Sequence, residues 1–176
     1  ERASLAVTRS LGRRGIPVYV GAETTRSLAG MSRYCRASFV YPSPWQAPDD
    51  YVACLLEQTR VHDAAVVFPM TDLAIELLGE PPLQDPAKFV LPIPSIEQYH
   101  ALSDKYCLMQ WAQNNGIPIP EARFLMDGDV EAILPGLDRW PVVVKPGRSL
   151  VRTHGSLKKT SVQYARNADE LRRLYA

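Results

Sequence analysis

Apolar and polar positions in the first third of the chain alternate between helical and strand patterns. Apolar residues have helical spacing over residues 2–14, and Gly15 then provides the left-handed conformation that closes a helix. Short apolar runs at residues 16–20 and 38–41 are typical of strands. A proline at the start of residues 48–61 favours the first turn of another helix. The pattern therefore predicts the order helix, strand, strand, helix.

The middle of the chain continues this alternation. Residues 64–68 form a continuous apolar run, which is expected of a strand buried on both faces of a parallel sheet. Thr71 can cap a helix after this run, residues 89–91 form another short strand pattern, and Ser95 can begin a short helix. Strands that alternate with helices over brief loops predict an α/β layered domain with a mostly parallel sheet.

The pattern changes after about residue 120, where the connections become more polar. Just before this point, Ser103 can cap a helix that runs through Asn115 and ends at Gly116. Three strand candidates follow, at residues 123–126, 142–144 and 161–164. Asn167 and Glu170 have the spacing of a capping box in front of a last helix. These elements predict a second unit of two or three strands with a terminal helix.

The composition is that of an ordinary globular protein rather than a disordered chain, with 46% apolar and 22% charged residues. No apolar run approaches the roughly 20 residues of a membrane span, and no charged-then-apolar leader opens the sequence. The three cysteines, Cys35, Cys54 and Cys107, are too few and too scattered for a disulfide framework or a zinc site, and we expect them to be small core residues. The expected compartment is a reducing cytoplasm.

The net charge of +1 hides an asymmetry between the two ends of the chain. Residues 1–144 carry 12 Lys and Arg against 17 Asp and Glu, whereas residues 145–176 carry 8 against 2. The net charges of −5 and +6 concentrate the capacity to bind anions in the last segment. Its only aromatic residues are Tyr164 and Tyr175, which form no stacking array, so nucleic-acid binding is a weak interpretation.

Two features of the basic segment could bind an anion. Lys145 ends a stiff run of three valines, which presents a compact cation at a fixed place, although a solvated lysine is common at a strand end. The loop at residues 147–156 combines glycines, hydroxyl groups and basic side chains that can approach or donate to an anion. The candidate ligand residues of this loop are Gly147, Arg148, Ser149, His154, Gly155 and Ser156. The alternative is a basic hairpin exposed to water.

Two further candidates lie earlier in the chain. Thr71 and Asp72 follow the most apolar strand pattern, at the carboxyl end where open α/β sheets bind ligands. The same residues can serve simply as a strand terminator and helix cap. Lys105 lies in the first turn of a predicted helix, where a cation is unfavourable for the helix dipole; the alternative is an ordinary surface lysine. The spacing of residues in the 147–156 loop matches neither the Walker A phosphate loop nor the dinucleotide fingerprint.

Four motifs follow one another along the chain: Ser-Asp-Lys at 103–105, Asn-Gly-Ile-Pro-Ile-Pro at 115–120, Pro-Val-Val-Val-Lys-Pro at 141–146 and the Gly/Ser/Arg loop. In this order, the motifs resemble the ATP-grasp superfamily. The likeness is to the carboxylate–amine ligase branch, which includes carbamoyl-phosphate synthetase and biotin carboxylase. It implies a Rossmann-like pre-ATP-grasp domain at residues 1–102. A linker helix and the first part of a small α+β ATP-grasp lid domain would occupy residues 103–176.

The resemblance also implies roles. Lys105 and Lys145 are expected to contact ATP phosphates, and the 147–156 loop is expected to close over them. Mg²⁺ would assist transfer of the γ-phosphate to a small carboxylate, and an amine or similar nucleophile would capture the acyl phosphate. The Mg²⁺ ligands are expected beyond residue 176. His154 is expected to be a loop donor rather than a catalytic base.

The sequence opens on Glu1 inside a helical pattern, and we expect it to be a piece of a longer protein. This piece is expected to lack the first strand of the pre-ATP-grasp domain. We therefore expect no ATP turnover by this piece alone. The competing hypothesis is a non-catalytic Rossmann-like module that binds a nucleotide or a sugar phosphate. The sequence leaves the oligomeric state open, a homodimer included, and it suggests neither a nucleic-acid nor a membrane partner.

Overall fold

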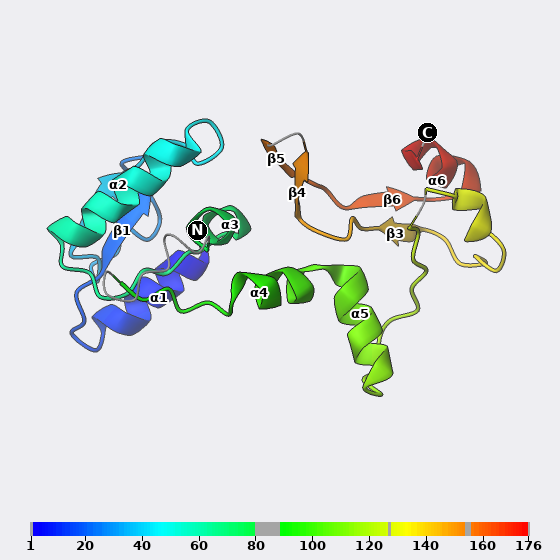
Figure 1. Ribbon diagram of the computed structural model, residues 1–176, viewed down its shortest axis with the longest axis horizontal. Helices are drawn as coiled ribbons and strands as arrows, with labels where there is room; N and C mark the ends of the chain where they lie inside the picture. Colours follow the sequence, from blue (N-terminus) through cyan, green and yellow to red (C-terminus); the bar gives the residue numbers. More distant parts are fainter. Residues whose placement is uncertain (1, 80–88, 127, 154–155, 176) are drawn as a thin grey trace. The chain divides into compact units, whose positions relative to one another are not determined.

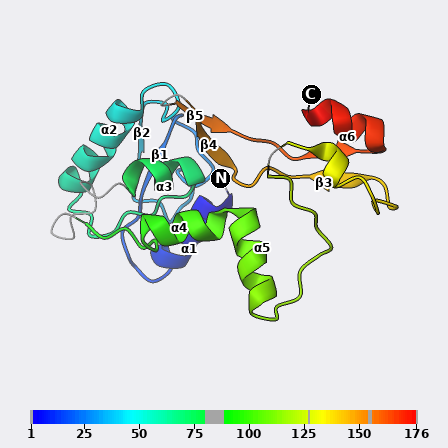
Figure 2. The same ribbon diagram turned by 45° about the vertical axis from the view of Figure 1, so that its right-hand side comes forward.

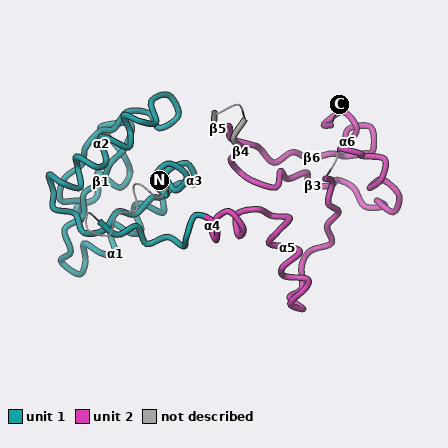
Figure 3. The backbone as a smooth tube through the Cα atoms, viewed as in Figure 1, with its two compact units in different colours: residues 1–96 teal, residues 97–176 magenta. Residues whose placement is uncertain are grey.

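The computed structural model describes residues 2–79, 89–126, 128–153 and 156–175 (Figure 1). It has mixed α/β structure with small sheets, each of two strands within these ranges (Figures 1 and 2). The chain divides into two compact units, unit 1 at Glu1–Ile96 and unit 2 at Glu97–Ala176 (Figure 3). The division lies at the start of α4 (Ile96–Ser103). The domain boundary after residue 102 stays a prediction.

The helices of unit 1 and its first two strands follow the predicted order. They are α1 (Arg2–Gly12), β1 (Tyr19–Ala22), β2 (Ala37–Val40), α2 (Pro48–Val61) and α3 (Asp72–Leu78). The prediction for α2 is confirmed at both ends. Its start follows from Pro48, which favours the first turn of a helix. Gly15 has φ of +77°, and the Ile16 N–H reaches back to the Leu11 carbonyl, so the predicted close of the first helix is also confirmed.

The strand pairing in unit 1 is parallel but limited. β1 pairs with β2 from Tyr19 opposite Ala37 to Ala22 opposite Val40. The apolar run at residues 64–68 contributes one isolated parallel bridge, from Val66 to Val90. The expectation of a strand buried on both faces is therefore wrong, since Val66 is 44% exposed. A strand becomes buried on both faces only where neighbours pair on both edges and helices cover both sides. Among the described residues this run has a single pairing partner.

Unit 2 contains α5 (Lys105–Asn114), the short 3-10 helix η2 (Val130–Ala132) and the terminal helix α6 (Ala168–Tyr175). Its strands are β3 (Val142–Val144), β4 (Leu150–Thr153), β5 (Ser156–Lys159) and β6 (Gln163–Ala165). β3 pairs with β6 and β4 pairs with β5, both antiparallel. The strand predicted at residues 123–126 is wrong, because this segment joins no sheet in the described part of the chain.

One hydrophobic cluster stabilises unit 2. Its buried members are Val130, Ala165 and Leu171, and partly buried side chains from the 125–144 region pack around them. Sheet β3–β6 therefore packs one face against η2 and α6. The alternating burial of β3, with Val143 exposed between its half-buried neighbours, follows from this one-sided packing.

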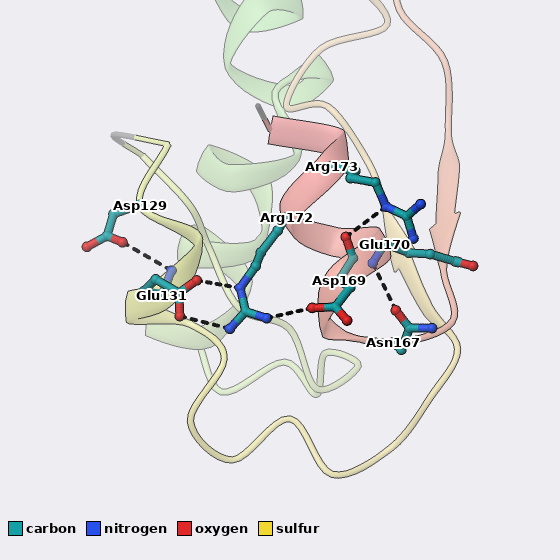
Figure 4. A network of polar contacts seen from close by, with 7 residues as sticks. All are labelled: Asp129, Glu131, Asn167, Asp169, Glu170, Arg172 and Arg173. Atoms are coloured by element: carbon teal, nitrogen blue, oxygen red, sulfur yellow. Dashed lines mark hydrogen bonds and ion pairs between the residues drawn. The ribbon is translucent and has the colours of Figure 1, made fainter.

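The ends of α6 and η2 are fixed by polar contacts (Figure 4). The Asn167 side chain accepts from the Glu170 N–H at 2.9 Å, and the Glu170 carboxylate accepts from the Arg166 N–H at 2.8 Å. The predicted cap by Asn167 is thus confirmed, whereas Glu170 binds the N–H of Arg166, one residue before the position that a capping box requires. Arg172 donates two hydrogen bonds to Glu131, at 2.6 and 3.1 Å, which tie α6 to η2. Within the described residues, no helix combines the length and the apolar character that a membrane span requires.

Candidate anion-binding site

The site begins at the N-terminal end of α5, where Asp104 is the cap. Its carboxylate Oδ1 accepts hydrogen bonds from the Tyr106 and Cys107 N–H groups, at 3.0 and 3.2 Å. The prediction that Ser103 caps this helix is wrong. Ser103 is the last residue of α4 and donates its hydroxyl to the His100 carbonyl. Only Asp104, with its extended backbone at φ −79° and ψ 113°, has the geometry of a cap.

Lys105 lies in the first turn of α5, as predicted, and contacts the loop after β3. Its backbone N–H donates to the Gly147 carbonyl at 2.9 Å, and its Nζ lies 3.3 Å from the same oxygen. The first N–H groups of a helix have no partner within the helix, so the loop supplies one acceptor for them. Two candidate residues that are far apart in the sequence are thereby brought together, near the connection between β3 and β4 (Figure 1).

A second contact joins the same two segments. Arg148 Nε lies 3.3 Å from Asp104 Oδ2, and the two side chains are 44% and 21% exposed. Partial burial alone would raise the pKa of the Asp104 carboxyl. The Cys107 N–H and the Arg148 guanidinium, followed by the Tyr106 N–H, outweigh that effect and lower the pKa below its ordinary value. Asp104 is therefore a charged carboxylate that faces a guanidinium.

The loop is also held from the side of β5. Thr160 donates its hydroxyl to the Arg148 carbonyl at 2.6 Å, and its N–H donates to the Ser149 carbonyl at 2.9 Å. β4 and β5 form an antiparallel hairpin, with Leu150 opposite Lys159. The segment predicted as a loop at residues 147–156 is therefore a short loop followed by the β4–β5 hairpin. A hairpin is the alternative that the sequence left open.

The remaining loop candidates are described only in part. His154 and Gly155 lie outside the described residues, and of Ser156 only its place as the first residue of β5 is described. Lys145 directly follows β3 and is exposed, and no hydrogen bond or ion pair of its ammonium is found in the described part of the chain. The segments 104–105 and 145–148 thus carry three cations, Lys105, Lys145 and Arg148, against the single carboxylate of Asp104. This balance favours an anionic ligand.

Thr71 and Asp72 lie in unit 1. The Thr71 hydroxyl accepts from the Ala74 N–H at 3.1 Å and caps α3, and Asp72 is the first residue of that helix. The interpretation as a helix cap is confirmed. A role of Thr71 and Asp72 in binding substrate stays a prediction.

The sequence reasoning missed Asp104 and Thr160 as members of the site. An aspartate just before the first helical residue is a known cap signal, and it could have identified Asp104. No local signal marks Thr160, whose two hydrogen bonds depend on hairpin pairing. In addition, no group of three or more His, Cys, Asp or Glu side chains able to hold a metal ion is found among the described residues.

Comparison with known proteins adds a finding on the fold. No protein-family profile and no curated protein matches the sequence. A solved structure does match: the biotin carboxylase domain dimer of 2-oxoglutarate carboxylase from Hydrogenobacter thermophilus, in complex with MgADP, ADP and bicarbonate. The match has a TM-score of 0.59 at 17% identity and covers 98% of this chain and 37% of that one. The chain shares the fold of part of a biotin carboxylase domain.

A biotin carboxylase subunit of pyruvate carboxylase also matches, with a TM-score of 0.49, 16% identity and the same two coverages. The first match concerns the fold alone, because its identity is low, and the second is too distant to add to it. The Hydrogenobacter neighbour is a biotin carboxylase domain, and such domains are ATP-grasp enzymes. A particular likeness to carbamoyl-phosphate synthetase is not part of this finding. The chain spans 37% of the length of these neighbours.

Proposed function

We propose that this chain is the amino-terminal part of an ATP-dependent carboxylate ligase of the ATP-grasp type. Residues 1–102 would form the Rossmann-like pre-ATP-grasp domain, and residues 103–176 would form the linker helix and the start of the ATP-grasp domain. The observation that carries the proposal is the contact between Lys105 and Gly147, which joins the first turn of α5 to the loop that follows Lys145 in the sequence. The fold shared with part of a biotin carboxylase domain supports it.

The described residues suit the phosphate groups of a nucleotide. Lys105 is held beside the loop by the Gly147 carbonyl, Lys145 is exposed, and Arg148 offers guanidinium N–H groups. These groups would bind and orient the triphosphate for transfer of its γ-phosphoryl group to a carboxylate oxygen. The products are an acyl phosphate and ADP, and an amine or similar nucleophile then displaces phosphate from the acyl group.

Mg²⁺ would supply charge neutralisation when it is bound with the nucleotide. Its protein ligands are expected in residues after 176. The complex of the Hydrogenobacter domain with MgADP, ADP and bicarbonate supports a nucleotide, Mg²⁺ and a small carboxylate as ligands. That domain is a dimer, which supports a homodimer as the assembly to test.

Binding of ATP and of inorganic tripolyphosphate to the 176-residue chain tests the phosphate site. Titration calorimetry at low salt should show binding that weakens about tenfold in Lys105→Ala and in Lys145→Ala, because each change removes a charged donor. Arg139→Ala is the control, since it removes the same charge from an exposed residue of unit 2. Absence of binding, or equal binding by the two lysine variants and the wild type, would contradict the proposal.

Turnover tests the ligase assignment. In a longer protein that contains this chain, phosphate release should be stimulated by a carboxylate and an amine and abolished by Lys145→Ala. Lysine-dependent binding without carboxylate-dependent release would favour the non-catalytic nucleotide-binding module instead. The 176-residue chain alone should not turn over ATP, and lysine-dependent turnover by it would overturn that expectation.

A further inference from the structure

The ion pair between Asp104 and Arg148 suggests a role that the phosphate site itself does not explain. We propose that Asp104 is a positioning residue that holds the Arg148 side chain until an anionic ligand takes over the guanidinium. Asp104 is then an internal competitor of the ligand and lowers the affinity for phosphate groups. This inference rests on the proposed function, because it concerns the same site.

The backbone of the loop is held independently of this ion pair. The Lys105 N–H binds the Gly147 carbonyl, while Thr160 binds the carbonyls of Arg148 and Ser149. Together these contacts fix residues 147–149 from α5 and from the end of the hairpin. Loss of the ion pair would therefore release the Arg148 side chain and leave the loop in place.

Asp104 and Arg148 also differ in how firmly their side chains are held. Asp104 stays at the helix end, because two backbone N–H groups bind its Oδ1. Arg148 reaches Oδ2 through Nε alone at 3.3 Å, and no hydrogen bond of its Nη atoms is found in the described part of the chain. An exposed ion pair of this kind contributes little to stability. Arg148 is thus the side chain that is free to exchange partners.

A phosphate ligand would bind the Arg148 guanidinium more strongly than Asp104 does. A phosphate group can accept two parallel hydrogen bonds from one guanidinium, which is stronger than a single long bond to a carboxylate. Phosphate would therefore draw Arg148 away from Asp104. The carboxylate that remains, with its partner gone, would then oppose the bound anion.

Asp104→Asn tests the proposal. Asparagine caps helices about as well as aspartate, so the variant keeps the α5 cap and removes only the charge. We expect the 176-residue chain with Asp104→Asn to bind inorganic tripolyphosphate about threefold to fivefold more tightly than the wild type. Tripolyphosphate is the appropriate probe, because it presents the phosphate charge without an adenine ring.

A matched control is available in the same unit. Asp129 is also an N-cap, since its Oδ1 accepts from the Glu131 N–H at the start of η2, and it is exposed. Asp129→Asn makes the same chemical change away from the loop and should leave the affinity unchanged. An equal gain in both variants would show a general charge effect and would overturn the proposal.

A double-mutant cycle separates exchange of Arg148 from simple repulsion. In an Arg148→Ala background, most of the gain from Asp104→Asn should disappear, because there is no side chain left to release. The same gain in that background would overturn the exchange. Circular dichroism of each variant shows that the fold is retained.

The outcomes also distinguish this inference from the proposed function. If the wild type binds tripolyphosphate through Lys105 and Asp104→Asn binds no more tightly, the inference fails and the phosphate site stands. If neither the wild type nor Asp104→Asn binds tripolyphosphate, the proposed phosphate site fails and the inference fails with it.

Discussion

Leu171 is the residue whose replacement most directly tests how unit 2 is held together. It lies on α6, is 2% exposed and belongs to the buried cluster with Val130 and Ala165. Leu171→Ala removes buried carbon atoms and leaves a cavity, and such changes cost about 2–5 kcal/mol. The side chains around the cluster are only partly buried and can move into part of the space. We therefore expect a loss of about 2–3 kcal/mol, in the lower half of that range.

Trp140 provides the assay, because it packs against this cluster. The chain has three tryptophans, and Trp45 and Trp111 are 45% and 56% exposed. In a background with Trp45→Phe and Trp111→Phe, the fluorescence of Trp140 reports on unit 2 alone. Urea unfolding should then show a lower midpoint for Leu171→Ala at an unchanged slope, which indicates a change in stability rather than in the surface exposed.

Arg172→Ala is the comparison that can refute this reasoning. Arg172 is the next residue on α6, and it binds Glu131 and Asp169 through its guanidinium on the surface. Solvent and salt screen such pairs, so the loss should be smaller than for Leu171→Ala and should shrink further at high salt. An equal or larger loss for Arg172→Ala would show that surface ion pairs, rather than the apolar cluster, stabilise unit 2.

Three further predictions concern other contacts. Thr71→Ala should lower the stability of unit 1 by about 1 kcal/mol through loss of the α3 cap, and Thr71→Ser should retain most of it, as measured by thermal unfolding. Gly12→Ala should destabilise unit 1 although alanine favours helix, because its Cβ would lie 2.6 Å from Tyr34 Cβ and 2.9 Å from the Tyr34 carbonyl; an unchanged melting temperature would contradict this. The pKa of Asp104 is lowered in the folded chain, so its stabilisation is complete above the ordinary pKa and is lost as the pH falls through the folded value. Denaturant midpoints between about pH 5 and pH 3 should therefore depend less on pH in Asp104→Asn than in the wild type.

Helix ends were the features most readily predicted from the sequence. Pro48 and Gly15 act on their own backbone, through a fixed φ in one case and a positive φ in the other. Their effect needs no distant partner: α2 begins at Pro48 as predicted, and α1 ends at Gly12, close to the predicted end before Gly15. The cap of α5 was misplaced by one residue, because Ser103 and Asp104 are both good caps and the choice depends on where α4 ends.

Strands were predicted less well, since a strand exists only where another strand pairs with it. Residues 64–68 are as apolar as a buried strand but make one bridge, and residues 123–126 pair with no strand in the described part of the chain. β3 was predicted correctly, and its pairing with β6 depends on a hydrophobic cluster built from residues 125–171. The apolar pattern of a short segment reflects its own side chains and does not show which strand pairs with it.

The candidate site contains both features that the sequence predicts and contacts that depend on a distant partner. Lys105, Lys145 and the loop after it were recognised as candidates by their order along the chain. The hydrogen bonds from Lys105 to Gly147 join residues 42 positions apart, and no local pattern encodes them. The pairing of Asp104 with Arg148 depends on the same tertiary contact. The sequence therefore shows Asp104 only as the middle residue of the Ser-Asp-Lys motif and does not predict its ion pair.

The basic charge at the end of the chain is partly neutralised by ion pairs. The net charge of +6 over residues 145–176 suggests a large capacity to bind anions. In the structure, Arg166 lies 3.7 Å from the Glu170 carboxylate, Arg172 is held by two carboxylates, and Arg148 faces Asp104. These three cations are already engaged, and two of the carboxylates that hold them come from residues before 145. The charge available to a ligand is therefore smaller than the sequence total, and it grows by one when Arg148 leaves Asp104.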